Sequence, residues 1–303
     1  MLVRTLTIQA QDWSIPVRLD RAGEVVTAGI WESAVISCVA ATVAYWRNFL
    51  TPSAAIAAAL IGCIVLVFGG WDWGLAMAGA FFVTSLLSER RDRIEQNDLS
   101  YANARRYLPQ VLANGIVLAL LAVLYGIGNR ESVGITAAFL GCVGSVAGDT
   151  WATAVARFSS KEPRLITSGS RVPAGTPGAV SGIGILLSGL AGVVASVLYF
   201  AVSMIVDGET TPVTLMSTLS CAAIVGALAG SLFDSFLGAA CQAQYTDPDG
   251  QLTDHPISSD GSSNTYIRGW RWLSNDLVNF GNSIAGAASA YFVWLAAESL
   301  KIV

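Results

Sequence analysis

The stretch SVGITAAFLGCVGSVAGDTWATAVAR occupies residues 132–157 and carries a single acidic side chain, Asp149, before its terminal Arg157. A helix that crosses a bilayer needs about 20 mostly apolar residues, and this segment is long enough. The hydrocarbon interior offers no water to an unpaired backbone group, so a segment within it must be helical. The stretch therefore predicts a membrane-spanning helix with one buried carboxylate near its end.

The rest of the chain repeats this pattern. Of the 303 residues, 53% are apolar and only 13% are charged, whereas soluble domains carry roughly a quarter charged residues. The sequence therefore predicts an all-α, polytopic integral membrane bundle of about eight transmembrane helices. Two of them are short and form a tight hairpin at Gly69-Gly70. The apolar segments are 26–46, 51–69, 71–88, 108–128, 132–157, 178–206, 213–241 and 276–297.

We expect one integral membrane domain over residues 1–303. Residues 1–24 lack an apolar core and are expected to form an amphipathic or extended surface segment, followed by the bundle over 26–297. The formal net charge is −4, and no Lys/Arg-rich run flanks interleaved aromatic residues. These features argue against a nucleic-acid surface, and we expect no nucleic-acid partner.

The distribution of Lys and Arg predicts the orientation. Connections inside the cell carry an excess of these residues. With the N-terminus outside, twelve of the 17 Lys and Arg side chains fall in inside connections. We therefore expect both termini outside, with the connections 88–107, 158–177 and 242–275 facing the cytoplasm.

Three carboxylates lie within or at the edge of apolar helices, where ionisable groups are costly and are functional candidates. Asp149 lies late in the fifth helix, Asp234 late in the seventh, and Asp276 at the start of the eighth. The predicted topology places all three at a similar depth near the inner surface. We predict that they are catalytic and that Asp149 and Asp234 bind a metal ion.

Other polar side chains recur at helical spacing on the same helices. Each such stripe is equally well explained by hydrogen bonding between helices, but several stripes point to one leaflet. Arg106, Gln110 and Asn114 are spaced by four residues, and Asn275, Asn279 and Asn282/Ser283 form a second stripe. The substrate-binding candidates from these helices are Arg106, Asn114, Thr150, Thr153, Ser235, Asn275 and Asn279.

The connection over residues 163–181 is rich in Pro, Gly and Thr and contains Arg164 and Arg171. A Gly-rich turn that opens a helix presents free N–H groups and a positive helix end to an anion. The binding candidates here are Arg164, Arg171, Gly175, Thr176 and Gly178. The alternative is a simple turn with Thr176 as the helix N-cap. Carboxylates beside such a loop favour a phosphate bound to Mg²⁺, and the lipid surroundings favour a substrate with a long apolar tail.

The remaining reactive residues point to no other chemistry. His255 is the single histidine and lies in the polar loop 247–263, so a multi-histidine metal site is excluded and we expect an ordinary loop residue. The five cysteines lie in or beside apolar segments without a C-x-x-C pair. They are expected to be small packing residues.

Six ordered motifs carry a resemblance to a known family. The sequence resembles, from about residue 50 to 290, the membrane family that contains transmembrane protein 19 and the phytyl-phosphate kinase of plants and cyanobacteria. The motifs are QVLANG at 110–115, GDTWAT at 148–153, PRLIT at 163–167, VPAGTPG at 172–178, DSFLGA at 234–239 and NDLVN at 275–279.

The resemblance implies a kinase that phosphorylates a phytyl or polyprenyl monophosphate to the diphosphate, as in tocopherol biosynthesis. It implies a nucleoside triphosphate as donor, with CTP favoured, and Mg²⁺ as cofactor. Its expected partners are the lipid phosphate, the nucleotide and the bilayer, and the choice between monomer and homodimer stays open. Two alternatives also stay open: a CTP-dependent cytidylyltransferase acting on a lipid phosphate, and an ion-coupled transporter with carboxylates near the membrane midplane.

Overall fold

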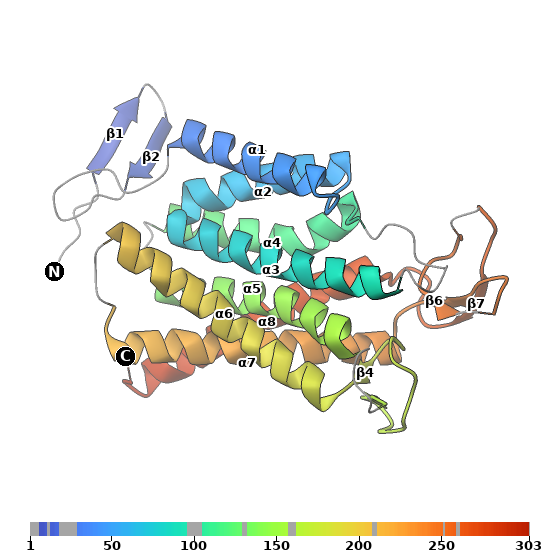
Figure 1. The fold of residues 1–303 in the computed structure, drawn as a ribbon. Helices are drawn as coiled ribbons and strands as arrows, with labels where there is room; N and C mark the ends of the chain where they lie inside the picture. The colour runs from blue at the N-terminus through green and yellow to red at the C-terminus, as the bar shows by residue number, and fades with distance from the viewer. Residues whose placement is uncertain are drawn as a thin grey trace.

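The structure is a computed structural model that describes residues 6–10, 13–17, 29–95, 105–128, 132–156, 162–207, 211–250, 252–258 and 261–302. Within these residues eight helices form an antiparallel bundle, as predicted (Figure 1). They are α1 (Ile30–Trp46), α2 (Pro52–Gly69), α3 (Trp71–Glu95), α4 (Leu108–Ile127), α5 (Val133–Ala156), α6 (Gly182–Asp207), α7 (Val213–Ala240) and α8 (Asn275–Ser299).

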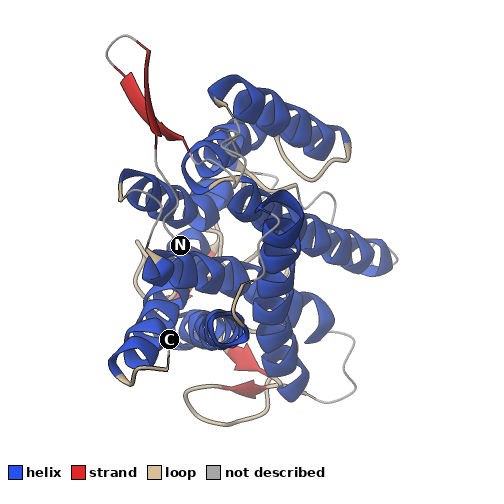
Figure 2. Ribbon diagram, turned by 90° about the vertical axis from the view of Figure 1, so that its left-hand side faces the viewer, coloured by secondary structure: helices blue, strands red, loops and turns tan. Residues whose placement is uncertain are grey.

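Short strands account for the remaining regular structure. β1 (Leu6–Ala10) and β2 (Trp13–Val17) pair antiparallel in a hairpin that projects from the bundle, so this part of the N-terminal segment is extended (Figure 2). β3 (Arg164–Leu165) pairs with β4 (Ala179–Val180). A three-stranded sheet orders β6 (Leu252–Thr253), β5 (Gln244–Thr246) and β7 (Thr265–Arg268).

Five of the described helices are long and apolar enough to cross a membrane, namely α2, α4, α5, α6 and α7, and α1 is a shorter apolar helix. The expected helical hairpin is confirmed: α2 ends at Gly69, and Gly70 with φ 96° makes the reversal into α3. Only glycine adopts such a φ readily. α3 continues past the predicted end at residue 88.

The helix predicted over 178–206 begins later, at Gly182. Gly178 has φ 83°, which a right-handed helix cannot contain, and the next two residues pair with β3. The Ser181 hydroxyl accepts a hydrogen bond from the Gly184 N–H at 3.1 Å and opens α6. The alternative N-cap at Thr176 is wrong, since that hydroxyl donates to the Pro173 carbonyl at 2.8 Å.

The direction of the helices separates the connections into two groups. The β1–β2 hairpin and the C-terminal end of α8 lie at one end of the bundle, and β4, β6 and β7 lie at the other (Figure 1). The turn after α1, the loop before α6 and the sheet before α8 therefore share one end. This convergence was predicted from topology; the side of the membrane that this end faces stays a prediction.

α5 is the central helix. It packs against α3, α4, α6, α7 and α8, and 72% of its span is buried, compared with 33–39% for the other four long apolar helices. Small residues permit the close approach: a Cβ added at Gly144 would lie 3.0 Å from the Ala227 side chain and 3.1 Å from the Gly192 Cα. The glycines within these helices therefore serve packing in lipid, as predicted. This packing holds α5 among the neighbouring helices up to Gly148, and Asp149 follows where the helix becomes less buried.

Candidate functional site

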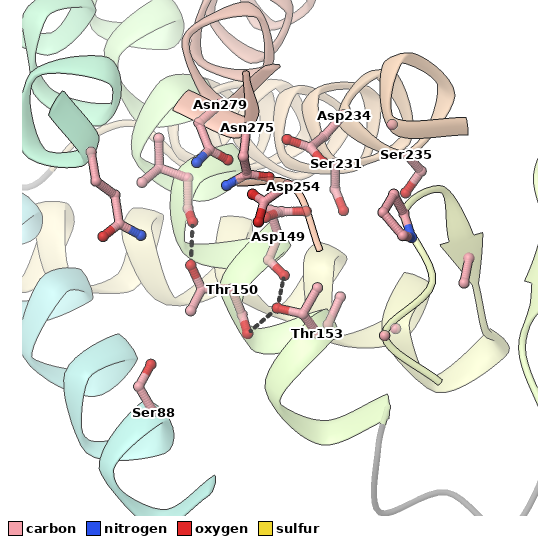
Figure 3. A pocket seen from close by; sticks show the side chains of 18 of the residues that line it. Ser88, Asp149, Thr150, Thr153, Ser231, Asp234, Ser235, Asp254, Asn275 and Asn279 are labelled. Carbon is pink, nitrogen blue, oxygen red and sulfur yellow. Dashed lines mark hydrogen bonds between the residues drawn. The ribbon is translucent and has the colours of Figure 1, made fainter. Parts of the chain in front are cut away.

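A cavity of about 950 Å³ opens at the end of the bundle that holds β4 and β6. Its wall combines residues from α3, α4, α5, α6, α7 and α8 with the α1–α2 turn and the other loops at that end. The sequence-predicted residues that line it are Arg106, Asn114, Asp149, Thr150, Thr153, Gly175, Thr176, Gly178, Asp234, Ser235, Asn275 and Asn279. Figure 3 shows several of these side chains around the cavity.

The two predicted metal ligands come together. Asp149 of α5 and Asp234 of α7 both line the cavity, and their carboxylates are close enough to interact electrostatically. The Oδ2 atom of Asp234 is buried and has no hydrogen-bond partner within the described structure. A buried carboxylate oxygen without a partner, beside a second carboxylate, is costly unless a cation binds there.

The donor set fits one kind of cation. Among the described residues, no three His, Cys, Asp or Glu side chains come close enough to form a metal cage from protein groups alone. Mg²⁺ uses one or two carboxylates and takes its remaining ligands from water and substrate phosphates. Asp149 and Asp234 therefore fit Mg²⁺ that arrives with a phosphate, and they do not form a closed structural site.

Two threonines on the last turns of α5 flank Asp149. The Thr150 hydroxyl donates to the Val146 carbonyl at 3.3 Å, and the Thr153 hydroxyl donates to the carbonyls of Asp149 and Thr150, each at 3.0 Å (Figure 3). Their protons are occupied within the helix, so the oxygens present only lone pairs to the cavity. Both can accept a hydrogen bond from a ligand or a metal-bound water.

The glycine-rich turn is fixed against the end of α7. A Cβ added at Gly178 would lie 2.4 Å from the Ala239 Cβ, and a Cβ at Gly238 would lie 3.1 Å from the Gly178 nitrogen. Only glycine permits the turn and the end of α7 to come this close. The positive φ of Gly178 also requires glycine. The contact places the turn over residues 175–178 on the cavity wall next to Asp234 and Ser235.

Arg164 and Arg171 lie outside the set of residues that line the cavity. The Arg164 Nη1 donates to the Gly169 carbonyl at 2.8 Å within its own turn, and both side chains are exposed. The loop contributes its proline and glycine backbone to the wall without these two guanidinium groups. The wall draws its positive charge from Arg47, Arg105 and Arg106 instead.

Arg106 lines the cavity, but not from the helical stripe that was predicted. It precedes the first residue of α4, and its backbone pairs with the α1–α2 turn: its N–H donates to the Phe49 carbonyl and its carbonyl accepts from the Thr51 N–H, both at 3.0 Å. Gln110 and Asn114 do lie on α4 and face the cavity. The stripe on α4 therefore begins at Gln110.

Asp276 is the predicted catalytic carboxylate that the structure leaves off the cavity wall. Asn275 and Asn279 share a face of α8 and line the cavity, whereas the next residue along a helix points roughly 100° away. The Tyr107 hydroxyl donates to both Asp276 oxygens, at 3.2 and 3.1 Å. Burial, followed by the charge of Asp276, raises the pKa of Tyr107, so the phenol stays a donor and ties the start of α8 to the start of α4.

The deeper half of the α8 stripe is packing. Asn282 and Ser283 are buried. The Asn282 amide donates to the Ser145 carbonyl at 3.4 Å, and the Ser283 hydroxyl contacts the Ala113 carbonyl at the same distance. Within two turns of α8, the polar side chains of this stripe therefore change from lining the cavity to forming hydrogen bonds between helices. The helical spacing of the residues does not show at which residue this change occurs.

Sequence reasoning missed the contribution of the loop before α8. β6 pairs with β5 through Tyr245 and Thr253, and this brings Asp254 and His255 to the cavity. The His255 Nε2 lies 3.6 Å from an Asp254 oxygen. His255 was expected to be an ordinary loop residue, and the sequence of this polar loop contains no signal for its return to the bundle.

Comparison with known proteins supplies a family. Residues 35–287 match the family described as integral membrane protein DUF92. Protein PGR of Arabidopsis thaliana is 30% identical over 81% of this chain and 89% of its own length. An uncharacterized membrane protein of Methanocaldococcus jannaschii is 29% identical over 69% of this chain and 82% of its own. One from Synechocystis is 27% identical, with coverages of 80% and 82%.

No solved structure matches the chain significantly. The family match covers most of the chain and nearly the whole helical bundle, including every motif quoted above. The chain belongs to the DUF92 family of integral membrane proteins.

Proposed function

We propose that this protein is a membrane-embedded kinase that converts a phytyl or polyprenyl monophosphate to the diphosphate, with a nucleoside triphosphate, CTP favoured, as donor. The observation that carries the proposal is the pair Asp149 and Asp234, in which a buried Asp234 oxygen inside a polar cavity lacks a hydrogen-bond partner among the described residues. The motifs that resemble the phytyl-phosphate kinase family supply the substrate class.

Asp149 and Asp234 would hold Mg²⁺, which neutralises phosphate charge when bound. Phosphoryl transfer depends mainly on positioning and on electrostatic stabilisation. The terminal phosphoryl group leaves the donor, and a phosphate oxygen of the lipid forms the new P–O bond. Asn114, Asn275 and Asn279 can donate amide hydrogen bonds to phosphate oxygens from the α4 and α8 walls.

An apolar section of the wall supports a lipid substrate. Ile185 of α6 and Leu228 and Leu232 of α7 line the cavity. Ile185 and Leu232 are 42% and 37% exposed, so they present apolar surface that a ligand can cover. A tail bound here would leave the polar cavity between α6 and α7 and enter the surrounding hydrocarbon.

The position of the carboxylates favours an enzyme over a transporter. A transporter binds its coupling ion near the midplane, on interrupted helices in corresponding halves. Asp149 and Asp234 lie near one end of continuous helices, beside loops that close one side of the cavity. A cytidylyltransferase would use the same groups, so the reaction product decides between the two enzymes.

The test incubates purified protein with Mg²⁺, CTP labelled at either the α- or the γ-phosphate, and phytyl, farnesyl or geranylgeranyl monophosphate. Transfer of the γ-label to lipid, giving the diphosphate, supports the kinase. Transfer of the α-label identifies a cytidylyltransferase. Labelled ATP, GTP and UTP test the donor. If no nucleotide labels any of the lipids, while the preparation still shows Mg²⁺-dependent thermal stabilisation, the proposal fails.

A further inference from the structure

Three arginines meet at a part of the cavity wall where the sequence pattern indicated only Arg106. Arg47 follows α1, whereas Arg105 and Arg106 precede α4, and all three line the cavity. The two segments are far apart in sequence and join because residues 49–51 and Arg106 exchange two backbone hydrogen bonds of 3.0 Å. Tertiary structure alone assembles the cluster.

The α1–α2 turn is shaped to hold this cluster. Asn48 has φ 61°, a left-handed conformation that asparagine tolerates better than most residues. Its side-chain oxygen accepts a hydrogen bond from the Arg105 guanidinium. The Arg106 guanidinium lies 4.8 Å from the centre of the Phe81 ring, and that of Arg47 lies 5.5 Å from the Phe49 ring. Cation–π contacts of this kind hold planar guanidinium groups in place.

The positive and negative charges in the cavity come from different elements of the bundle. The guanidinium groups come from the α1–α2 turn and the start of α4, and the carboxylates Asp149 and Asp234 come from α5 and α7. A polyphosphate with bound Mg²⁺ has the complementary distribution, with its metal ion at the carboxylates and its remaining anionic oxygens free for cations. Arginine suits those oxygens because its fork can donate two parallel hydrogen bonds.

We propose that Arg47, Arg105 and Arg106 form the phosphate-binding subsite of the cavity, the role that the sequence had suggested for Arg164 and Arg171. The inference rests on the proposed function for the identity of its ligand, a phosphorylated substrate. The phosphate groups can belong to the nucleotide or to the lipid, and the experiment below separates the two.

The experiment measures binding, without turnover, to purified protein in detergent by equilibrium dialysis in the presence of Mg²⁺. The probes are labelled pyrophosphate, which stands for the nucleotide end, and geranyl monophosphate, which stands for the lipid end. Arg105→Ala should weaken one of these probes roughly ten- to a hundredfold, because charge-assisted hydrogen bonds are lost. Arg105 is exposed, so the substitution should leave the fold intact, and Arg47→Ala provides a second, independent variant.

Arg171→Ala is the matched control, since its side chain is exposed but lies off the cavity wall. Its affinity for both probes should stay within about twofold of the parent, well below the loss of one charged hydrogen bond. Arg105→Lys should recover only part of the affinity, since lysine keeps the charge and loses the fork. Loss of pyrophosphate binding identifies a nucleotide subsite, and loss of geranyl monophosphate binding identifies an acceptor subsite.

Two results overturn the inference: unchanged affinity for both probes in Arg105→Ala and Arg47→Ala, or an equal loss in Arg171→Ala. Neither depends on catalysis. Arginine-dependent binding without lipid phosphorylation contradicts the proposed kinase and keeps the subsite. Kinase activity together with binding that does not depend on the arginines supports the proposed kinase and overturns the subsite.

Discussion

Replacing Asp234 by Asn should separate the stability of this protein from its function. The substitution keeps the shape of the side chain and removes its charge. In the parent, Asp234 Oδ2 is buried and has no hydrogen-bond partner in the part of the chain that the structure describes, and its carboxylate lies within electrostatic range of Asp149. An amide at this position carries no charge, so the repulsion between the two carboxylates is removed. The metal-free variant should therefore unfold at the same temperature as the parent or higher, although most substitutions of buried polar groups destabilise.

Mg²⁺ should distinguish the two proteins. A ligand that binds only the folded state stabilises it by about 2.7 kcal/mol when its concentration is a hundred times its Kd. The parent should therefore gain several degrees in unfolding temperature with saturating Mg²⁺ and pyrophosphate, and Asp234→Asn should lose most of this gain. The variant should also lose kinase activity. The assay is thermal unfolding of purified protein in detergent, with and without these ligands.

Asp249→Asn is the matched control, because Asp249 is an exposed carboxylate outside the cavity wall. It should keep both the Mg²⁺-dependent stabilisation and the activity. The reasoning is refuted if metal-free Asp234→Asn unfolds well below the parent. It is equally refuted if the variant keeps the full Mg²⁺ response, since the unpartnered oxygen would then have no part in metal binding.

Three further predictions test the fold around the site. Gly178→Ala should destabilise by about 2–5 kcal/mol in thermal or denaturant unfolding, from strain at φ 83° and a 2.4 Å approach to Ala239; an unaltered transition would contradict the docked turn. Trp151→Phe removes the 2.9 Å hydrogen bond to the Thr84 hydroxyl and should lower stability by about 1–3 kcal/mol in the same assay; parent-like stability would deny the α3–α5 link. With exposed native cysteines replaced, Ser299→Cys should react with a membrane-impermeant reagent in intact cells and Ser168→Cys only after permeabilisation; the reverse pattern would invert the topology.

The sequence by itself determined the helical membrane architecture. Long apolar segments can only be helices in a bilayer, so the eight segments and the hairpin at Gly69-Gly70 followed from length and hydropathy. Antiparallel succession then required the ends of the fifth and seventh helices to meet at one end of the bundle. Asp149 and Asp234 were therefore predictable, since a charge inside an apolar helix is a strong signal that needs no long-range information.

Only the tertiary structure decided which polar residues face the cavity. Helical spacing assigns side chains to a face but does not say how far along that face the cavity extends, so Asn275 and Asn279 line it while Asn282 is buried in packing. Asp276 lies off the cavity wall, next to Asn275, because one residue along a helix changes the direction of the side chain. Loop residues carry no periodicity at all. Arg105 reaches the cavity through a strand-like pairing between distant segments, which local sequence does not encode, and His255 reaches it through the short pairing of β5 with β6.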